Sequence, residues 1–291
     1  MGSDPMVEFH YRVPWLAEGS RPGHHRARCA GAGFEFRGHA TLHAEPDARR
    51  LDVRASINDP SRNWQVRVFN QRSSIRVILL ADLSASMGFE GRHRKFELIA
   101  AFTESAAYSA ARAGDAFGFI GADARVRKEF FRPPRAARGA GAPLAQRLRT
   151  FIADGDGAGG LPAAANLLGR QRALIFLLSD FHWPAPLMES TLAALTRHAV
   201  VPVVLWDEAE LKLPRSGFAT LVDAESGTTR FIWLRRGLRE AFARQIDERR
   251  EYLLRTFLRF CRAPLYLRAP FDADAVTDYF FAARPRLENA A

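Results

Sequence analysis

Cysteine and long apolar runs are scarce in this chain. Only two cysteines, Cys29 and Cys261, occur among 291 residues. One such pair does not make a disulfide-stapled scaffold, and a reducing compartment, the cytoplasm, is the expected environment. No apolar run approaches the roughly 18 residues of a membrane-spanning helix. The first residues also lack the apolar stretch of a signal peptide. We therefore expect a cytoplasmic globular protein, and nothing in the sequence supports a membrane contact.

Lysine is almost absent, although the chain is strongly basic. Three of the 42 basic side chains are lysine, and the formal net charge is +10. A basic surface attracts acidic proteins, anionic lipids or nucleic acids. The basic residues are scattered, however, and form no stripe interleaved with aromatic residues of the kind that binds nucleic acid. Nucleic acid is therefore not an expected partner.

The motifs of several enzyme classes are also missing. The sequence contains neither G-x-x-x-x-G-K-[ST] nor G-x-G-x-x-G, so no phosphate loop of a nucleotide fold is predicted. No G-x-S-x-G elbow surrounds Ser84 or Ser86, which argues against a serine hydrolase. Five of the eight histidines lie in the first 45 residues, but their spacings match no compact set of metal ligands. We interpret this region as solvated loops.

Short apolar runs alternate with helical patterns from Ile75 onwards. Continuous apolar runs at 75–82, 172–180 and 199–207 are typical of strands covered on both faces. This alternation predicts an α/β fold, a Rossmann-like, doubly wound and mostly parallel sheet. Helices are expected at 95–114, 142–153, 162–171, 186–198, 236–262 and 273–286, and a hairpin at 217–234 that turns at Ser226–Gly227.

The amino-terminal part has a different texture. Alternating patterns at 34–46 and from Trp64 predict strands of an N-terminal β extension. We expect a flexible segment at 1–27, whose first five residues resemble an expression scar, the β extension at 28–74, and the main α/β domain at 75–291. Three arginines flank Asp52 and predict either a partner contact or an ion-pair latch; they are Arg49, Arg50 and Arg54.

Oxygen-bearing side chains follow two of the apolar strands. Asp82 ends "ILLAD", Asp180 ends "FLLSD", and the hydroxyls of Ser84 and Ser86 come directly after the first strand. Because ligands of open α/β sheets bind beyond the carboxyl ends of the strands, these side chains are expected to converge. Three interpretations stay open: a site for a hard cation such as Mg²⁺, a helix cap, or an anion site at a helix amino end.

The D-x-S-x-S pattern resembles the metal-ion-dependent adhesion site of von Willebrand factor A (vWA) domains, and "LLSDF" resembles the later acidic loop of that site. More narrowly, the chain resembles a bacterial vWA-like family of unknown function that accompanies MoxR-type AAA+ ATPases. The resemblance runs from about residue 28 to the end, through "GAGFEFRG", "DARRLDVRAS", "QVRVFNQR", "LADLSASM" and "LWDEAELKLPRSGFATLVDAESG".

This resemblance implies a von Willebrand A-type fold and a divalent cation, Mg²⁺ or another, bound by Ser84 and Ser86, with Asp82 and Asp180 acting partly through water. It also implies an adaptor rather than an enzyme, with a partner carboxylate completing the site and a MoxR-type ATPase as partner. The stretches "FHYRVPW" and "RPGHHRARCAGAG" are most similar to the MxaS-like members, which implies a role with the maturation proteins of methanol dehydrogenase, including calcium supply.

Two departures from the family pattern bear on the site. In "GAGGLP", Leu161 stands where the adhesion site has a threonine, which removes one direct oxygen ligand. Val53 also replaces the usual tryptophan.

The alternative function is a metal-dependent hydrolase of a phosphorylated substrate that uses the same carboxylates, with His182 as general base. Trp183 is interpreted as either an exposed anchor or a cover of the core, and "DGDGAGG" (154–160) as a loop, since it lacks the ligand set of a calcium-binding EF-hand.

Overall fold

The computed structural model describes residues 7–17, 22–31, 35–89, 91–155, 157–211, 217–222, 229–234 and 236–282. The chain divides into a larger unit, residues 1–12 and 76–291, and a smaller unit, residues 13–75.

The expected flexible segment at 1–27 is therefore not one segment. Phe9 is only 1% exposed, and its N–H donates a 2.9 Å hydrogen bond to Ser109 Oγ. Tyr11 donates to Asp115 at 2.6 Å, so this part of the chain is anchored in the larger unit.

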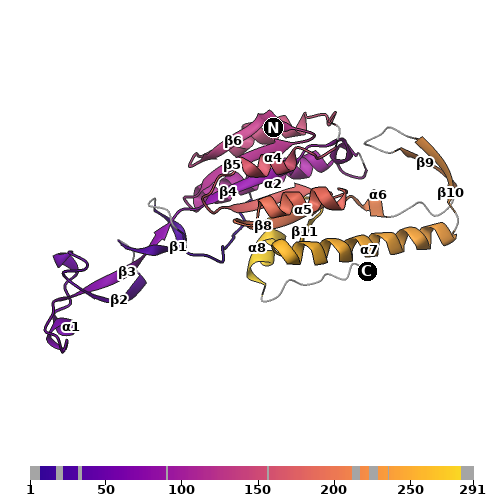
Figure 1. The fold of residues 1–291 in the computed structure, drawn as a ribbon. Helices are drawn as coiled ribbons and strands as arrows, with labels where there is room; N and C mark the ends of the chain where they lie inside the picture. The colour runs from indigo at the N-terminus through magenta and orange to yellow at the C-terminus, as the bar shows by residue number, and fades with distance from the viewer. Residues whose placement is uncertain are drawn as a thin grey trace. The chain divides into compact units, whose positions relative to one another are not determined.

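A six-stranded sheet forms the centre of the larger unit (Figure 1). Its order is β11-β8-β7-β4-β5-β6, and all neighbours run parallel except β5 and β6. The predicted doubly wound, mostly parallel sheet is confirmed. The chain builds outward from β4 in both directions, so the order of the strands reverses between β4 and β7. The strands are β4 (Arg76–Asp82), β5 (Ala116–Ala122), β6 (Val126–Arg135), β7 (Leu174–Ser179), β8 (Ala199–Leu205) and β11 (Leu265–Leu267).

Helices cover both faces of this sheet, as the continuous apolar strands predict. On one face, Phe102 of α2 (Lys95–Arg112) packs against Phe176 of β7 at 5.1 Å, and Phe280 of α8 (Ala273–Phe281) lies 6.0 Å from Phe176. On the other face, one buried apolar cluster joins β4 to α4 (Leu161–Asn166), α5 (Ala185–Ala194) and α7 (Arg236–Phe260). α3 (Gly141–Arg149) packs on α2.

The smaller unit is an antiparallel sheet of order β1-β3-β2, which fits the predicted β extension. Its strands are β1 (Pro22–Gly31), β2 (Glu35–Thr41) and β3 (Gln65–Ser73), with the short helices η1 (Ala48–Arg50) and α1 (Val53–Ile57) between β2 and β3. β1 lies in a region that we expected to be loop. Its glycines, histidines and arginines show no alternation, and its strand conformation comes from backbone pairing with β3, which is distant in sequence.

Asp52 caps α1 by accepting a 3.0 Å hydrogen bond from the N–H of Ala55. Its carboxylate also contacts Arg67 Nε at 2.7 Å and His39 Nε2 at 3.1 Å. Arg50, one of the three flanking arginines, pairs with Asp47 instead. The ion pair at Asp52 is therefore formed across the sheet, by residues outside the flanking set.

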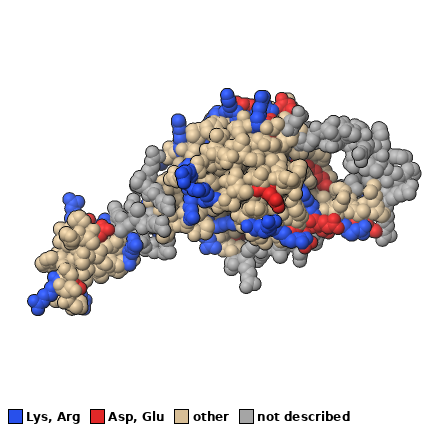
Figure 2. Space-filling model, in the orientation of Figure 1, with Lys and Arg blue, Asp and Glu red and all other residues tan. Residues whose placement is uncertain are grey.

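The remaining elements are η2 (Ala85–Gly88), α6 (Glu208–Leu211) and the hairpin of β9 (Gly217–Val222) and β10 (Thr229–Leu234). The predicted turn at Ser226–Gly227 lies outside the described residues. Within the described ranges, no helix is long and apolar enough to span a bilayer. On the face drawn in Figure 2, Lys and Arg side chains lie scattered among acidic and other residues, without a single basic stripe.

Candidate functional site

The ends of β4 and β7 bring the predicted acidic residues to one edge of the sheet. Leu80 pairs with Leu177 and Ala81 with Leu178, so the two strands end side by side. Asp82 is the last residue of β4, and Asp180 directly follows β7. Both residues are buried: Asp82 has 0% of its surface exposed to solvent and Asp180 has 1%. The two acids therefore lie at one edge of the sheet, as expected, and the structure shows that the strand order reverses there.

Both carboxylate oxygens of Asp82 accept hydrogen bonds from protein donors. Its Oδ1 accepts the N–H of Ser84 at 3.0 Å, and its Oδ2 accepts Ser179 Oγ at 2.7 Å and Trp183 Nε1 at 2.8 Å. Burial, together with the negative charge of Asp180, raises the pKa of Asp82 to about 6. A carboxylate offers about four lone-pair positions, so most of the accepting capacity of Asp82 is already used within the protein.

Asp180 is paired with a buried lysine. Lys95 Nζ lies 2.9 Å from Asp180 Oδ2, and the other oxygen accepts the N–H of His182 at 3.1 Å. Burial raises the pKa of Asp180, but the charge of Lys95 and the hydrogen bonds from Lys95 and the His182 N–H together outweigh burial and hold the pKa below its ordinary value. Asp180 is consequently an ionised partner of Lys95.

Lys95 has an acceptor for each of its three ammonium N–H groups. Besides Asp180, these are Glu210 Oε1 at 2.5 Å and the backbone carbonyl of Ser86 at 3.3 Å. Only 4% of Lys95 is exposed, and the residue begins α2. Positive charge at a helix amino end is unfavourable, and two carboxylates compensate for it here. Neither Lys95 nor Glu210 was predicted from the sequence as a site residue.

The segment after β8 brings Glu210 to this position. Asp207 accepts the N–H groups of Arg92 at 2.9 Å, His93 at 3.0 Å and Ala209 at 2.8 Å. A side chain at Gly91 would collide with Asp207, since an added Cβ would lie 2.7 Å from its Cγ. Asp207 thus fixes the loop before α2, while Glu210 in the same D-x-x-E pattern reaches Lys95. The D-x-x-E pattern in "LWDEAEL" was the sequence feature from which Asp207 and Glu210 could have been identified.

The two serines lie beside the predicted loop 154–160. Ser84 Oγ is 3.2 Å from Ser86 Oγ, and the N–H of Ala85 donates to the carbonyl of Gly155 at 3.1 Å. Asp154 of this loop pairs with Arg127 Nη2 at 2.6 Å. Its carboxylate is therefore used in an ion pair of the loop.

The side chains as they lie do not fit a divalent cation. Asp82 and Asp180 point their oxygens at protein donors, and the ammonium of Lys95 stands among the acidic groups. Leu161 is 0% exposed and belongs to the apolar core, so the middle loop supplies carbon at the position where an adhesion site has a hydroxyl. Within the described residues, no group of three or more His, Cys, Asp or Glu side chains is placed to hold a metal ion.

The loop after β7 is fixed by aromatic packing. Trp183 is 5% exposed, and its ring lies 5.0 Å from that of Phe181, so it covers the core and is not an exposed anchor. Phe181 has a φ of 55°, a strained conformation for a bulky residue. Its carbonyl accepts a hydrogen bond from Arg249 of α7. The exposed ring of His182 stacks on Trp206, with 6.0 Å between the ring centroids.

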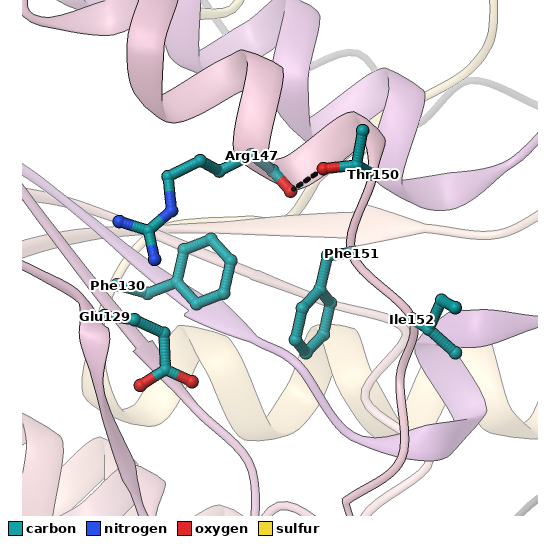
Figure 3. A pocket seen from close by; sticks show the side chains of 6 residues that line it. All are labelled: Glu129, Phe130, Arg147, Thr150, Phe151 and Ile152. Atoms are coloured by element: carbon teal, nitrogen blue, oxygen red, sulfur yellow. Dashed lines mark hydrogen bonds between the residues drawn. The ribbon is translucent and has the colours of Figure 1, made fainter.

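Two shallow pockets adjoin this edge and share Phe151 and Ile152. One has a volume of about 200 Å³ and is lined by η2 and the start of α2, including Phe89 and Lys95. The other, of about 320 Å³, lies between β6 and the end of α3 (Figure 3). In it, the rings of Phe130 and Phe151 meet edge to face at 5.1 Å. Ile152 is 79% exposed and Phe89 39% exposed, so apolar surface borders the polar cluster.

Comparison with known proteins identifies relatives of the chain. The family model described as "Protein of unknown function DUF58" matches residues 46–252. The chain is 28% identical over 278 residues to "Uncharacterized protein Rv1480" of Mycobacterium tuberculosis, covering 92% of this chain and 85% of that protein.

Among solved structures, the chain is similar to the conserved hypothetical protein BatB from Bacteroides thetaiotaomicron, with a TM-score of 0.39 and 14% identity over 70% of this chain and 96% of that one. A von Willebrand factor type A structure from Catenulispora acidiphila gives a TM-score of 0.33 and 15% identity over 48% of this chain and 35% of that one.

Proposed function

The chain belongs to the DUF58 family, and from that premise we propose that it is a non-enzymatic adaptor that binds a partner protein at the carboxyl edge of its central sheet. The observation that carries this proposal is the exposed apolar surface beside the polar cluster. Ile152 is 79% exposed and lines both pockets of this edge. Large exposed apolar side chains next to well-packed aromatic residues are typical of protein-binding surfaces.

The polar cluster also favours binding over catalysis. The carboxylate oxygens of Asp82 and Asp180 are engaged by buried donors of the protein. The hydrolase alternative uses these carboxylates to hold a metal ion, so the protein's own donors would have to release them first. This engagement of the carboxylates favours the adaptor.

The proposed partner is a MoxR-type AAA+ ATPase, and the proposed process is the maturation of methanol dehydrogenase, including metal insertion, in the cytoplasm. The MoxR-type partner is supported by the sequence resemblance from "GAGFEFRG" to "LWDEAELKLPRSGFATLVDAESG", and the methanol dehydrogenase role by the resemblance of "FHYRVPW" and "RPGHHRARCAGAG" to the MxaS-like members. The D-x-x-E part of that resemblance coincides with Asp207 and Glu210, which build one wall of the site.

Ile152→Asp tests this function by placing a charge in the exposed apolar surface. We expect the affinity for a purified MoxR-type ATPase, measured by biolayer interferometry, to fall at least about tenfold. Ile57→Asp is the matched control, because Ile57 is 78% exposed and lies in the smaller unit. Unchanged affinity of the Ile152 variant would remove the carboxyl edge as the binding surface, and loss in the control variant alone would move that surface to the smaller unit.

A further inference from the structure

We propose that Lys95 is the resident cation of this site, so that an internal ammonium group does the work for which an adhesion site uses a divalent metal ion. The inference deepens the proposed function, on which it rests for the biological use of the site. If Lys95 is the resident cation, the unmodified chain binds its partner without Mg²⁺, and divalent ions bind at this edge only when Lys95 is replaced.

The contacts of Lys95 supply the first argument. The ammonium group is buried and contacts Asp180, Glu210 and the carbonyl of Ser86 within 3.3 Å. Three acceptors satisfy its three N–H donors. A cation in this place already performs the task of neutralising acidic groups that two strands and one helix bring together. A divalent ion would have to separate Asp180 from Lys95 and then remain beside a buried ammonium group that keeps only Glu210 as a charged partner.

The chemistry left by removal of the ammonium supplies the second argument. Asp180 and Glu210 would keep their negative charges, and the carbonyl of Ser86 would lose its donor. Carboxylate, carbonyl and hydroxyl oxygens, here with Ser84 and Ser86 nearby, are the ligands that hard divalent cations prefer. The replacement of the usual threonine by Leu161 agrees with this reading, because a site that holds an ammonium group needs fewer oxygen ligands.

Calorimetric titration with Mn²⁺ tests the inference on the full-length chain. We expect no saturable binding to the unmodified protein at millimolar Mn²⁺. Lys95→Met should bind Mn²⁺ saturably, with a Kd at least about tenfold below the highest Mn²⁺ concentration at which the unmodified protein shows no binding. Addition of Asp180→Asn to Lys95→Met should abolish the gain. Lys128→Met, at an exposed lysine of β6, is the matched control and should behave like the unmodified protein.

The folding of the variants is followed in parallel. Lys95→Met with Glu210→Gln removes one charge of each sign, and it is the second variant in case the single variant does not fold. Mn²⁺ at saturating concentration should raise the melting temperature of a folded Lys95 variant by about 4 °C or more, without effect on the unmodified protein.

A folded Lys95 variant that gains no Mn²⁺ affinity overturns the inference. If neither variant folds, the unmodified chain decides: Mn²⁺ binding that is lost in Asp82→Asn overturns the inference, and no binding supports it. No partner is present in these measurements, so their failure is separate from a failure of the adaptor function.

Discussion

The side chains of Lys95 and Asp180, 85 residues apart in the chain, meet at 2.9 Å in the interior of the larger unit. One residue begins the helix after β4, and the other follows the neighbouring strand β7. The ion pair therefore joins the two crossovers that leave the sheet in opposite directions at its reversal point. It fixes the loop of Ser84 and Ser86 on one side and the loop of Trp183 on the other.

Asp180→Asn should destabilise the protein by about 3 kcal/mol, because removal of one partner leaves a buried charge undercompensated. Glu210 remains as a second carboxylate beside Lys95. The loss of stability is therefore expected at the lower end of the range for breaking a buried ion pair. Urea denaturation measures the change. The control is Glu208→Gln: its pair with Arg92 is exposed, with 54% and 72% of the side chains accessible, and should contribute less than about 1 kcal/mol. Equal losses in the two variants would contradict a structural role of the buried pair.

The raised pKa of Asp82 makes stability depend on pH in a defined direction. Its pKa is about 6 in the folded chain, against an ordinary value of 3.8. Between these values the folded state binds the proton more tightly than the unfolded state, so this group lowers stability as pH rises from about 4 to about 6. The stability of the unmodified protein relative to Asp82→Asn should fall by about 2 kcal/mol between pH 4 and pH 7. Urea denaturation across this range checks the slope, and a constant difference between the two proteins would refute it.

The central sheet and the convergence of Asp82 and Asp180 could be predicted because both depend on local patterns. A continuous apolar run marks a strand that is covered on both faces, and the residue after each run falls at the carboxyl edge. The strand β1 could not be predicted in this way. Its residues 22–31 have no alternation, and its conformation depends on pairing with β3, some forty residues further along the chain.

The ion-pair network at Lys95 was missed for a related physical reason. A single lysine at the start of a helix is ordinarily a solvated residue, and its burial here follows from acids that two distant strand ends supply. The D-x-x-E pattern of Asp207 and Glu210 was visible as a motif, but not its two tasks of fixing a loop and neutralising Lys95. Leu161 was recognised as a missing ligand, whereas the ammonium group that accompanies this loss was not.

Trp183→Phe removes the indole N–H that donates to Asp82 while keeping an aromatic ring against Phe181. Because the carboxylate then loses one of its buried donors, we expect a destabilisation of about 1–3 kcal/mol in urea denaturation. The same change at Trp64, which is 58% exposed, should alter stability by less than about 0.5 kcal/mol. A neutral Trp183 variant would show that this hydrogen bond does not hold Asp82.

Gly155 tests how tightly the loop beside the serines is packed. A Cβ at this position would lie 2.6 Å from Asp123 Cγ, and Asp123 is buried against Arg127. Gly155→Ala should therefore force the loop away from Ser84 and destabilise the protein by about 1–3 kcal/mol, the usual range for overpacking. The control is Gly159→Ala in the same loop, where an added Cβ meets nothing within 4 Å and stability should change by less than about 0.5 kcal/mol. Thermal unfolding of both variants gives the comparison. If the two substitutions have the same small effect, the loop moves without cost, and the rigid contact between Ala85 and Gly155 is not what positions the serines.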